Sequence, residues 1–281
     1  MRYGLSLANF GDFAEARQVA DLARSAEAAG WDALLVWDHL AFAWGPPSGD
    51  PWTLVTACAL ATTRLLVGTD VSVIARERPL SFANRVATVD RLSGGRVVLG
   101  VGIGGAVDEY RKAGEPVDLR ERAALTDEML SIVRPLLAGE TVIHDGPSFT
   151  VDDVTLAPLP VGAPVPVWGG GESRGARRRA ARHDGWIPFP YDEAGNLQMT
   201  PDQLGGFLGE IRAERAAAEI PPDAPFAVAM HGETPGPGED GAAIVRPWAE
   251  AGATWWLESL HGSRGTAKQL MARVKAGPPR G

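Results

Sequence analysis

The sequence predicts an α/β fold of the (β/α)8 TIM-barrel type, with a short hairpin insertion after the fourth helix. The chain has 281 residues, which suits one such barrel of roughly 250 residues. Short β-rich apolar runs alternate with helical patterns eight times along the chain. No change of composition marks a domain boundary, so we expect a single domain over residues 1–281. A doubly wound open sheet is the alternative, because eight units can also lie flat.

The first four units are predicted from hydrophobic periodicity and from the residues that begin or end helices. Apolar residues recur at helical spacing before Gly30, and glycine commonly follows a helix end. Pro51 opens the second helix, since proline suits a first helical turn. The expected strands are 3–8, 32–37, 65–69 and 96–101, and the expected helices are 13–29, 51–62, 80–92 and 119–137.

The region 139–160 interrupts this alternation. Two short β-like pieces, 141–143 and 149–151, flank Asp145-Gly146, which is typical of a hairpin turn. Strands are expected again at 165–168, 185–188, 226–230 and 254–258, with helices after Ser173 and at 201–219, 242–251 and 266–276. We expect the hairpin and the 188–200 loop to border a site at the strand ends.

Charge and cysteine content exclude several classes of protein. The formal net charge of −8 and the pI of about 5.2 argue against nucleic-acid or membrane-surface partners. The single Cys58 excludes an internal disulfide and suits a reducing compartment. The N-terminal residues lack a signal-peptide pattern, and no apolar run approaches the ~20 residues that span a bilayer. We therefore expect a cytoplasmic protein that acts on a small molecule.

A titratable pair directly follows the second predicted strand. The apolar run Leu34-Leu35-Val36-Trp37 is typical of a buried strand, and Asp38-His39 and a long loop containing Trp44 come next. Active sites of α/β proteins lie at the carboxyl ends of strands. The sequence therefore indicates His39 as a catalytic residue with Asp38 and Trp44 beside it. The alternative is that His39 only caps the strand.

A glycine-rich segment, Gly100-Val101-Gly102-Ile103-Gly104-Gly105, follows the fourth strand. It formally fits the dinucleotide pattern G-x-G-x-x-G, but that fingerprint belongs in a first βαβ unit, directly before a helix. The position favours a loop whose backbone, at Gly102 and Gly104, approaches a planar ligand.

A second cluster, Trp168-Gly169-Gly170-Gly171-Glu172-Ser173, joins a strand to a helix. Glycine N–H groups and the positive end of the helix dipole favour a phosphate there. Ser173 is either the N-cap or a phosphate ligand, and Arg174 in the first turn is within reach of an anion. Ordinary turn chemistry is the alternative.

Other catalytic classes lack their motifs. The five histidines are scattered without an H-x-H or H-E-x-x-H pair, so no metal is expected, and G-x-S-x-G is absent. Tryptophans fall at or just beyond strand ends, where they would wall a pocket for a flat aromatic ring. These are Trp37, Trp44, Trp168 and Trp186.

Together these pieces resemble the luciferase-like family of flavin- and deazaflavin-dependent oxidoreductases, from residue 3 to about 279. The resemblance rests on Ala29-Gly30-Trp31-Asp32, Trp37-Asp38-His39, Asp50-Pro51-Trp52, Leu92-Ser93-Gly94-Gly95-Arg96, Leu99-Gly100-Val101-Gly102-Ile103-Gly104, Pro166-Val167-Trp168-Gly169-Gly170 and Asp184-Gly185-Trp186. It implies a (β/α)8 barrel, often as a homodimer.

The resemblance also implies a cofactor and its site. An isoalloxazine-type ring would lie across the strand ends, with its phosphate at Gly169, Gly170 and Ser173. The family's third strand often carries a non-prolyl cis peptide against the ring, and the matching residues are Asp70 and Val71. The Asp-His pair is similar to the branch that uses the deazaflavin coenzyme F420, in which this histidine and a nearby tryptophan line the hydride-transfer site. Hydride transfer between F420 and a small organic substrate is therefore the implied function.

Three alternatives stay open. The FMN branch uses the same barrel as a monooxygenase, a non-catalytic relative would bind a flavin only, and an isomerase would bind sugar phosphates without a redox cofactor.

One departure concerns sugar-phosphate dehydrogenases of the F420 branch, in which a carboxylate acid follows the glycine loop. Gly105 and Ala106 stand there, and Asp108 and Glu109 come later. This argues against sugar-phosphate oxidation and leaves His39 as the candidate proton donor.

Overall fold

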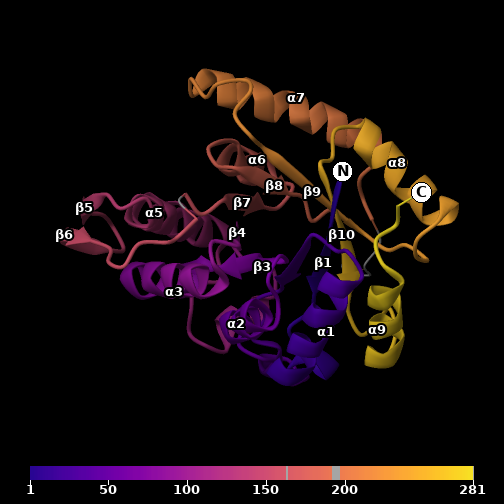
Figure 1. The fold of residues 1–281 in the computed structure, drawn as a ribbon. Coiled ribbons are helices and arrows are strands. Elements are labelled where there is room, and N and C mark those ends of the chain that lie inside the picture. Colours follow the sequence, from indigo (N-terminus) through magenta and orange to yellow (C-terminus); the bar gives the residue numbers. More distant parts are fainter. Residues whose placement is uncertain (163, 192–196, 281) are drawn as a thin grey trace.

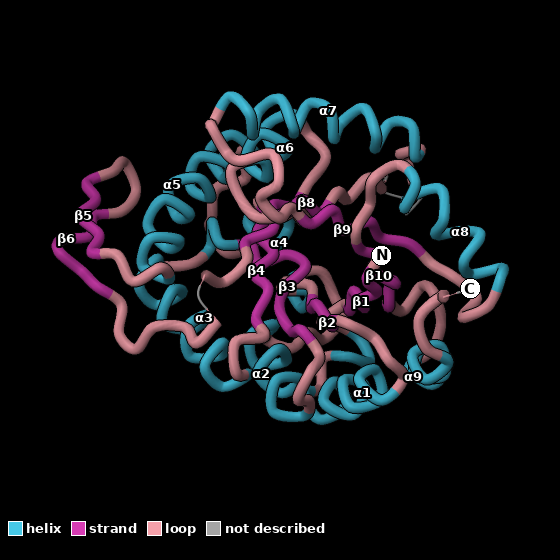
Figure 2. The backbone as a smooth tube through the Cα atoms, turned by 45° about the horizontal axis from the view of Figure 1, so that its top comes forward, coloured by secondary structure: helices cyan, strands magenta, loops and turns pink. Residues whose placement is uncertain are grey.

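The computed structural model describes residues 1–162, 164–191 and 197–280. Eight parallel strands close into a barrel in the order β1-β10-β9-β8-β7-β4-β3-β2, inside a ring of helices (Figures 1 and 2). The predicted TIM barrel is therefore confirmed, and the open sheet is excluded. The barrel strands are β1 (Arg2–Leu7), β2 (Ala33–Val36), β3 (Leu66–Val73), β4 (Val97–Gly102), β7 (Val167–Gly170), β8 (Gly185–Ile187), β9 (Ala227–Gly232) and β10 (Trp255–Leu260).

The helices follow the predicted order, with one addition. The described α-helices are α1 (Ala16–Ala28), α2 (Pro51–Ala61), α3 (Pro79–Ser93), α4 (Val107–Arg111), α5 (Leu119–Leu137), α6 (Arg174–Ala181), α7 (Pro201–Ala217), α8 (Glu239–Glu250) and α9 (Ala267–Ala276). The short α4 was not predicted, and β3 extends to Val73 rather than ending at residue 69. Among the described residues, the structure has no helix with the length and apolar character needed to cross a bilayer.

The predicted hairpin forms from β5 (Thr141–Asp145) and β6 (Thr150–Thr155), which pair antiparallel. It packs on the outer side of α5, where Glu128 accepts hydrogen bonds from the backbone N–H of Ser148 (3.1 Å) and Phe149 (2.9 Å). Figure 2 shows it outside the helix ring. The expectation that the hairpin borders the strand ends is therefore wrong. Residues 192–196 of the 188–200 loop lie outside the described part of the chain.

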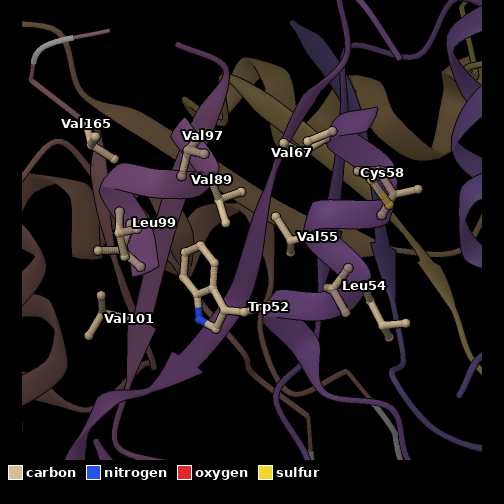
Figure 3. Packing of buried hydrophobic residues seen from close by; sticks show 14 of the residues in the cluster. Trp52, Leu54, Val55, Cys58, Val67, Val89, Val97, Leu99, Val101 and Val165 are labelled. Atoms are coloured by element: carbon tan, nitrogen blue, oxygen red, sulfur yellow. The ribbon is translucent and has the colours of Figure 1, made fainter. Parts of the chain in front are cut away.

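The main core lies between the barrel and its helices. Trp52, Val55 and Cys58 of α2 pack near Val67 of β3 and Leu99 of β4 (Figure 3). Burial raises the pKa of the Cys58 thiol to about 12, so this cysteine stays uncharged at neutral pH. Apolar burial of this kind supplies most of the free energy that closes a barrel.

The barrel interior differs between its two ends. Near the amino ends of the strands, the rings of Trp168 and Trp255 meet at 5.3 Å between centroids, and Trp168 is only 4% exposed. Trp186 is buried among residues of α6, α7 and α8. The prediction that Trp168 and Trp186 wall the site is therefore wrong. Sequence position alone does not tell which way a strand residue points, because side chains alternate between the two faces.

The third strand contains the expected non-prolyl cis peptide, between Asp70 and Val71. The pairing of β3 with β4 shifts its register at this point. Two glycines, one on the adjacent β4 and one on β7, make room for the Val71 side chain. A Cβ atom on Gly102 would lie 2.4 Å from Val71 Cγ2, and one on Gly170 would lie 2.9 Å from Val71 Cγ1. Both glycines are therefore explained by packing inside the protein.

We predict that Gly102→Ala lowers the free energy of unfolding by roughly 1–3 kcal/mol, because the added methyl overlaps Val71. Urea denaturation measures the change. Val71→Ala in the Gly102→Ala background should recover part of the loss, as expected for residues in contact. Gly105→Ala is the control, since its Cβ would meet nothing within 4 Å. Equal stability of the Gly102 and Gly105 variants would contradict the assignment.

Candidate active site

Asn9 holds the backbone of the loop that carries His39. The buried Asn9 follows β1, and its amide donates to the carbonyl of His39 (2.8 Å) while its Oδ1 accepts from the His39 N–H (3.0 Å). The same amide donates to the Gly49 carbonyl at the far end of the loop (2.8 Å). One side chain therefore fixes both ends of the loop after β2. Sequence reasoning missed Asn9, for which no motif exists.

Glu109 of α4 is the centre of the site. Its Oε1 lies 2.7 Å from His39 Nδ1 and accepts a hydrogen bond from Trp44 Nε1 (3.2 Å). Its Oε2 accepts from Arg76 Nη1 (2.7 Å), and the Glu109 side chain is 2% exposed. The sequence places Glu109 later than the loop carboxylate of the sugar-phosphate dehydrogenases, and the structure nevertheless brings its carboxylate into the site. Glu109 lies in α4, which was not predicted, and this helix places its carboxylate next to His39 and Arg76.

Asp38 joins the same ion-pair network through Arg76. Arg76 Nη2 donates to Asp38 Oδ1 (2.8 Å), and the backbone N–H of Val73 donates to Asp38 Oδ2 (2.8 Å). The side chains of Asp38 and Arg76 are each 10% exposed. Asp38 thus neighbours His39 in sequence, but its carboxylate binds Arg76 and the end of β3.

The electrostatics decide which nitrogen of His39 carries hydrogen. Burial raises the pKa of Glu109, but the hydrogen bond and charge of His39, the Trp44 N–H and the Arg76 charge outweigh it and lower the pKa to about 2. Glu109 is therefore an ionised acceptor at neutral pH, and His39 Nδ1 must be the donor. Nε2 is left as the nitrogen available to a ligand. Burial raises the pKa of Asp38 despite the opposing Arg76 charge.

A second polar cluster closes the carboxyl end of the barrel interior. Asp70 Oδ2 accepts from Ser6 Oγ (2.6 Å) and lies 2.6 Å from His231 Nε2. Trp37 Nε1 donates to Ser6 Oγ (2.6 Å), which links this cluster to the loop after β2. Burial alone lowers the pKa of His231, but the charge and hydrogen bond of Asp70 outweigh it, so the pKa is raised. Asp70 was a predicted site residue, whereas Ser6 and His231 were missed.

The first predicted glycine loop packs against α4. Gly104 has a φ of +73°, and a Cβ there would lie 2.2 Å from the Tyr110 hydroxyl. That hydroxyl donates to the Ile103 carbonyl (2.7 Å), and the Arg122 guanidinium stacks 4.1 Å from the Tyr110 ring. Gly104 therefore lets α4 come close to the loop after β4, which places Glu109.

The second glycine cluster has a more limited role than predicted. Gly169 is buried, and a Cβ there would lie 2.8 Å from Ala180 of α6. Gly171 has a φ of +103°, and its N–H already donates to the Ile187 carbonyl (2.9 Å). Ser173 caps α6 by accepting from Ala176 N–H (3.2 Å). The first-turn N–H groups of α6 are the groups left for an anion.

Arg174 is exposed at the start of α6. It lines a groove of about 540 Å³ between α6 and α7, together with Arg177, Arg178, Glu210 and Glu214. In the described parts of the chain, no group of three or more His, Cys, Asp or Glu side chains is arranged to hold a metal ion.

The protein is a TIM barrel. Its candidate site contains the ionised Glu109 beside His39 and lies at the carboxyl ends of the strands. The chain belongs to the luciferase-like monooxygenase family, whose model matches residues 2–234. Among curated relatives, F420-dependent glucose-6-phosphate dehydrogenase of Beutenbergia cavernae is 36% identical over 169 residues, covering 58% of this chain and 49% of that protein. The enzyme of the same name from Nakamurella multipartita is 33% identical over 177 residues, covering 60% and 51%.

Solved structures share the fold. Coenzyme F420-dependent tetrahydromethanopterin reductase from Methanopyrus kandleri superposes with a TM-score of 0.76 at 16% identity, covering 99% of this chain and 98% of that chain. Monooxygenase RslO1 from Streptomyces bottropensis has a TM-score of 0.77 at 20% identity, covering 98% and 97%. At these identities the likeness concerns the barrel alone.

Arg76→Met should lower the free energy of unfolding by about 3–5 kcal/mol, because it leaves two buried carboxylates without their shared cation. Chemical denaturation at pH 7 measures this. Arg24→Met, which removes an exposed pair with Asp21, is the control and should stay close to wild type. A similar small effect for both variants would show that Arg76 does not hold the network together.

The low pKa of Glu109 predicts a pH dependence of stability. The folded-state pKa of about 2 lies below the ordinary value of 4.5, so this stabilisation is complete above about pH 4.5 and is lost as the pH falls toward 2. Urea denaturation of wild type and Glu109→Gln at pH 6 and pH 3 tests this. The wild-type protein should lose more stability than the variant. Glu15→Gln, at an exposed position, should behave like wild type.

Proposed function

We propose that this protein is an F420-dependent oxidoreductase that moves a hydride between the deazaflavin ring and a small organic substrate. The observation that carries the proposal is the Glu109–His39–Trp44 arrangement, which leaves one imidazole nitrogen free beside an ionised carboxylate. Family membership supports an oxidoreductase, and the F420-dependent relatives favour the deazaflavin branch.

The residues present fit such a cofactor. Val71 is a half-buried apolar side chain that follows Asp70 on β3, and Trp37 is joined to Asp70 through Ser6. The first turn of α6 offers N–H groups for a phosphate, with Arg174 on the same helix. When bound, F420 supplies a ring carbon that accepts or donates a hydride.

The side chains of this protein handle the accompanying proton. In alcohol oxidation, the bound cofactor would supply the hydride acceptor for the C–H hydrogen, and the hydroxyl proton would go to His39 Nε2. The ionised Glu109 stabilises the imidazolium that forms, and Arg76 holds Glu109 in place. In the reverse direction, His39 returns the proton to the carbonyl oxygen.

An FMN-dependent monooxygenase on the same barrel is the second candidate. The matched family model and the barrel of RslO1 both belong to monooxygenases. The two candidates differ in cofactor preference, which binding measurements distinguish.

The test is a titration of the apo-protein with F420 and with FMN, followed by tryptophan fluorescence. We expect F420 to bind with a Kd below roughly 100 μM and more tightly than FMN. His39→Ala should then slow hydride transfer about 10²- to 10⁴-fold with little change in the Kd of F420. His144→Ala, on the hairpin, is the matched control. Tighter FMN binding would favour the monooxygenase, and wild-type turnover of His39→Ala would make His39 structural.

A further inference from the structure

Aromatic rings surround His39. The Phe10 ring lies 5.7 Å from the His39 ring and 5.3 Å from Trp44, and Trp37 lies 6.0 Å from His39. Phe189, after β8, meets Trp37 edge-on at 6.2 Å. Trp44 and Phe189 are 41% and 45% exposed. We call Phe10, Trp37, Trp44 and Phe189 the aromatic wall. Exposed ring surface of this kind gains free energy when another ring covers it.

Basic residues are scarce around this wall. The described segments between each barrel strand and the long helix after it, including the short α4, cover residues 8–15, 37–50, 74–78, 103–118, 171–173, 188–191, 197–200, 233–238 and 261–266. In the sequence, these loops contain more than twice as many acidic as basic residues. Their Lys and Arg residues are Arg76, Arg78, Arg111, Lys112 and Arg264.

Carboxylates pair with four of these five basic side chains, Arg78 being the exception. Arg76 binds the two site carboxylates, and Arg111 and Lys112 both pair with Asp108. Arg264 pairs with Glu233, which follows β9, and with Glu258 of β10. The Arg78 guanidinium lies 6.0 Å from the ring of Phe149 in the turn of the hairpin. A phosphate monoester needs cationic partners that are not already neutralised, and a surplus of carboxylates repels it.

We propose that the substrate is an uncharged compound with an aromatic ring and a hydroxyl or carbonyl group, held by the aromatic wall with its oxygen at His39 Nε2. The proposal rests on the proposed function for the chemistry, and on the wall and the loop charges for the substrate class. It separates this chain from the relatives named for glucose 6-phosphate.

The experiment measures binding to the apo-protein, so that it does not depend on the cofactor. Saturation-transfer NMR titrations compare acetophenone with glucose 6-phosphate at one ionic strength. We expect acetophenone to bind at least tenfold more tightly. Phe189→Ala should weaken acetophenone binding about tenfold, because it removes one ring contact. Phe189 is exposed, so its loss should leave the fold intact, and Ile143→Ala, on the exposed hairpin, is the control.

Two outcomes would overturn the proposal: glucose 6-phosphate binding as tightly as acetophenone, or a Phe189→Ala variant that binds acetophenone like wild type. Absence of F420 binding in the separate titration would defeat the proposed function and leave the ring-binding result standing. In the F420-loaded protein, faster hydride transfer from glucose 6-phosphate than to acetophenone would contradict the proposed substrate class, but not the proposed function.

Discussion

The Glu109 carboxylate is the interaction on which the rest of the site depends. It joins His39 and Trp44 from the loop after β2, Arg76 from the segment after β3, and its own helix α4 after β4. Because the group is buried and charged, it is stable only with all its partners in place. The same bonds that hold three loops together therefore set the hydrogen on His39 Nδ1 and leave Nε2 to a ligand.

The interior of the barrel is apolar near the amino ends of its strands and polar near their carboxyl ends, where the site lies. Tryptophan rings fill the interior near the amino ends of the strands, while Ser6, Asp70 and His231 occupy the opposite end. Gly102 of β4 and Gly170 of β7 leave room for the Val71 side chain of β3. These two glycines resembled ligand-binding positions in the sequence. In the structure they contact the Val71 side chain, so packing explains them.

The sequence predicted the barrel because hydrophobic periodicity reports which residues face the core. It also predicted that Asp38, His39 and Trp44 gather at one strand end, and resemblance added the cis peptide. It missed Glu109, because the position of a carboxylate in a long loop depends on a helix of five residues with little periodicity. It misplaced Trp168, because one step along a strand reverses the direction of a side chain.

By itself, then, the sequence determined the order of the strands and helices, the strand ends that carry titratable groups, and the shortage of basic residues around them. These follow from local patterns and from composition. Only the tertiary structure decided that Glu109 rather than Asp38 contacts His39, that Asn9 fixes the His39 loop, and that His231 lies on Asp70. Those contacts join segments far apart in the chain, so they exist only after the closing of the barrel brings the strand ends together.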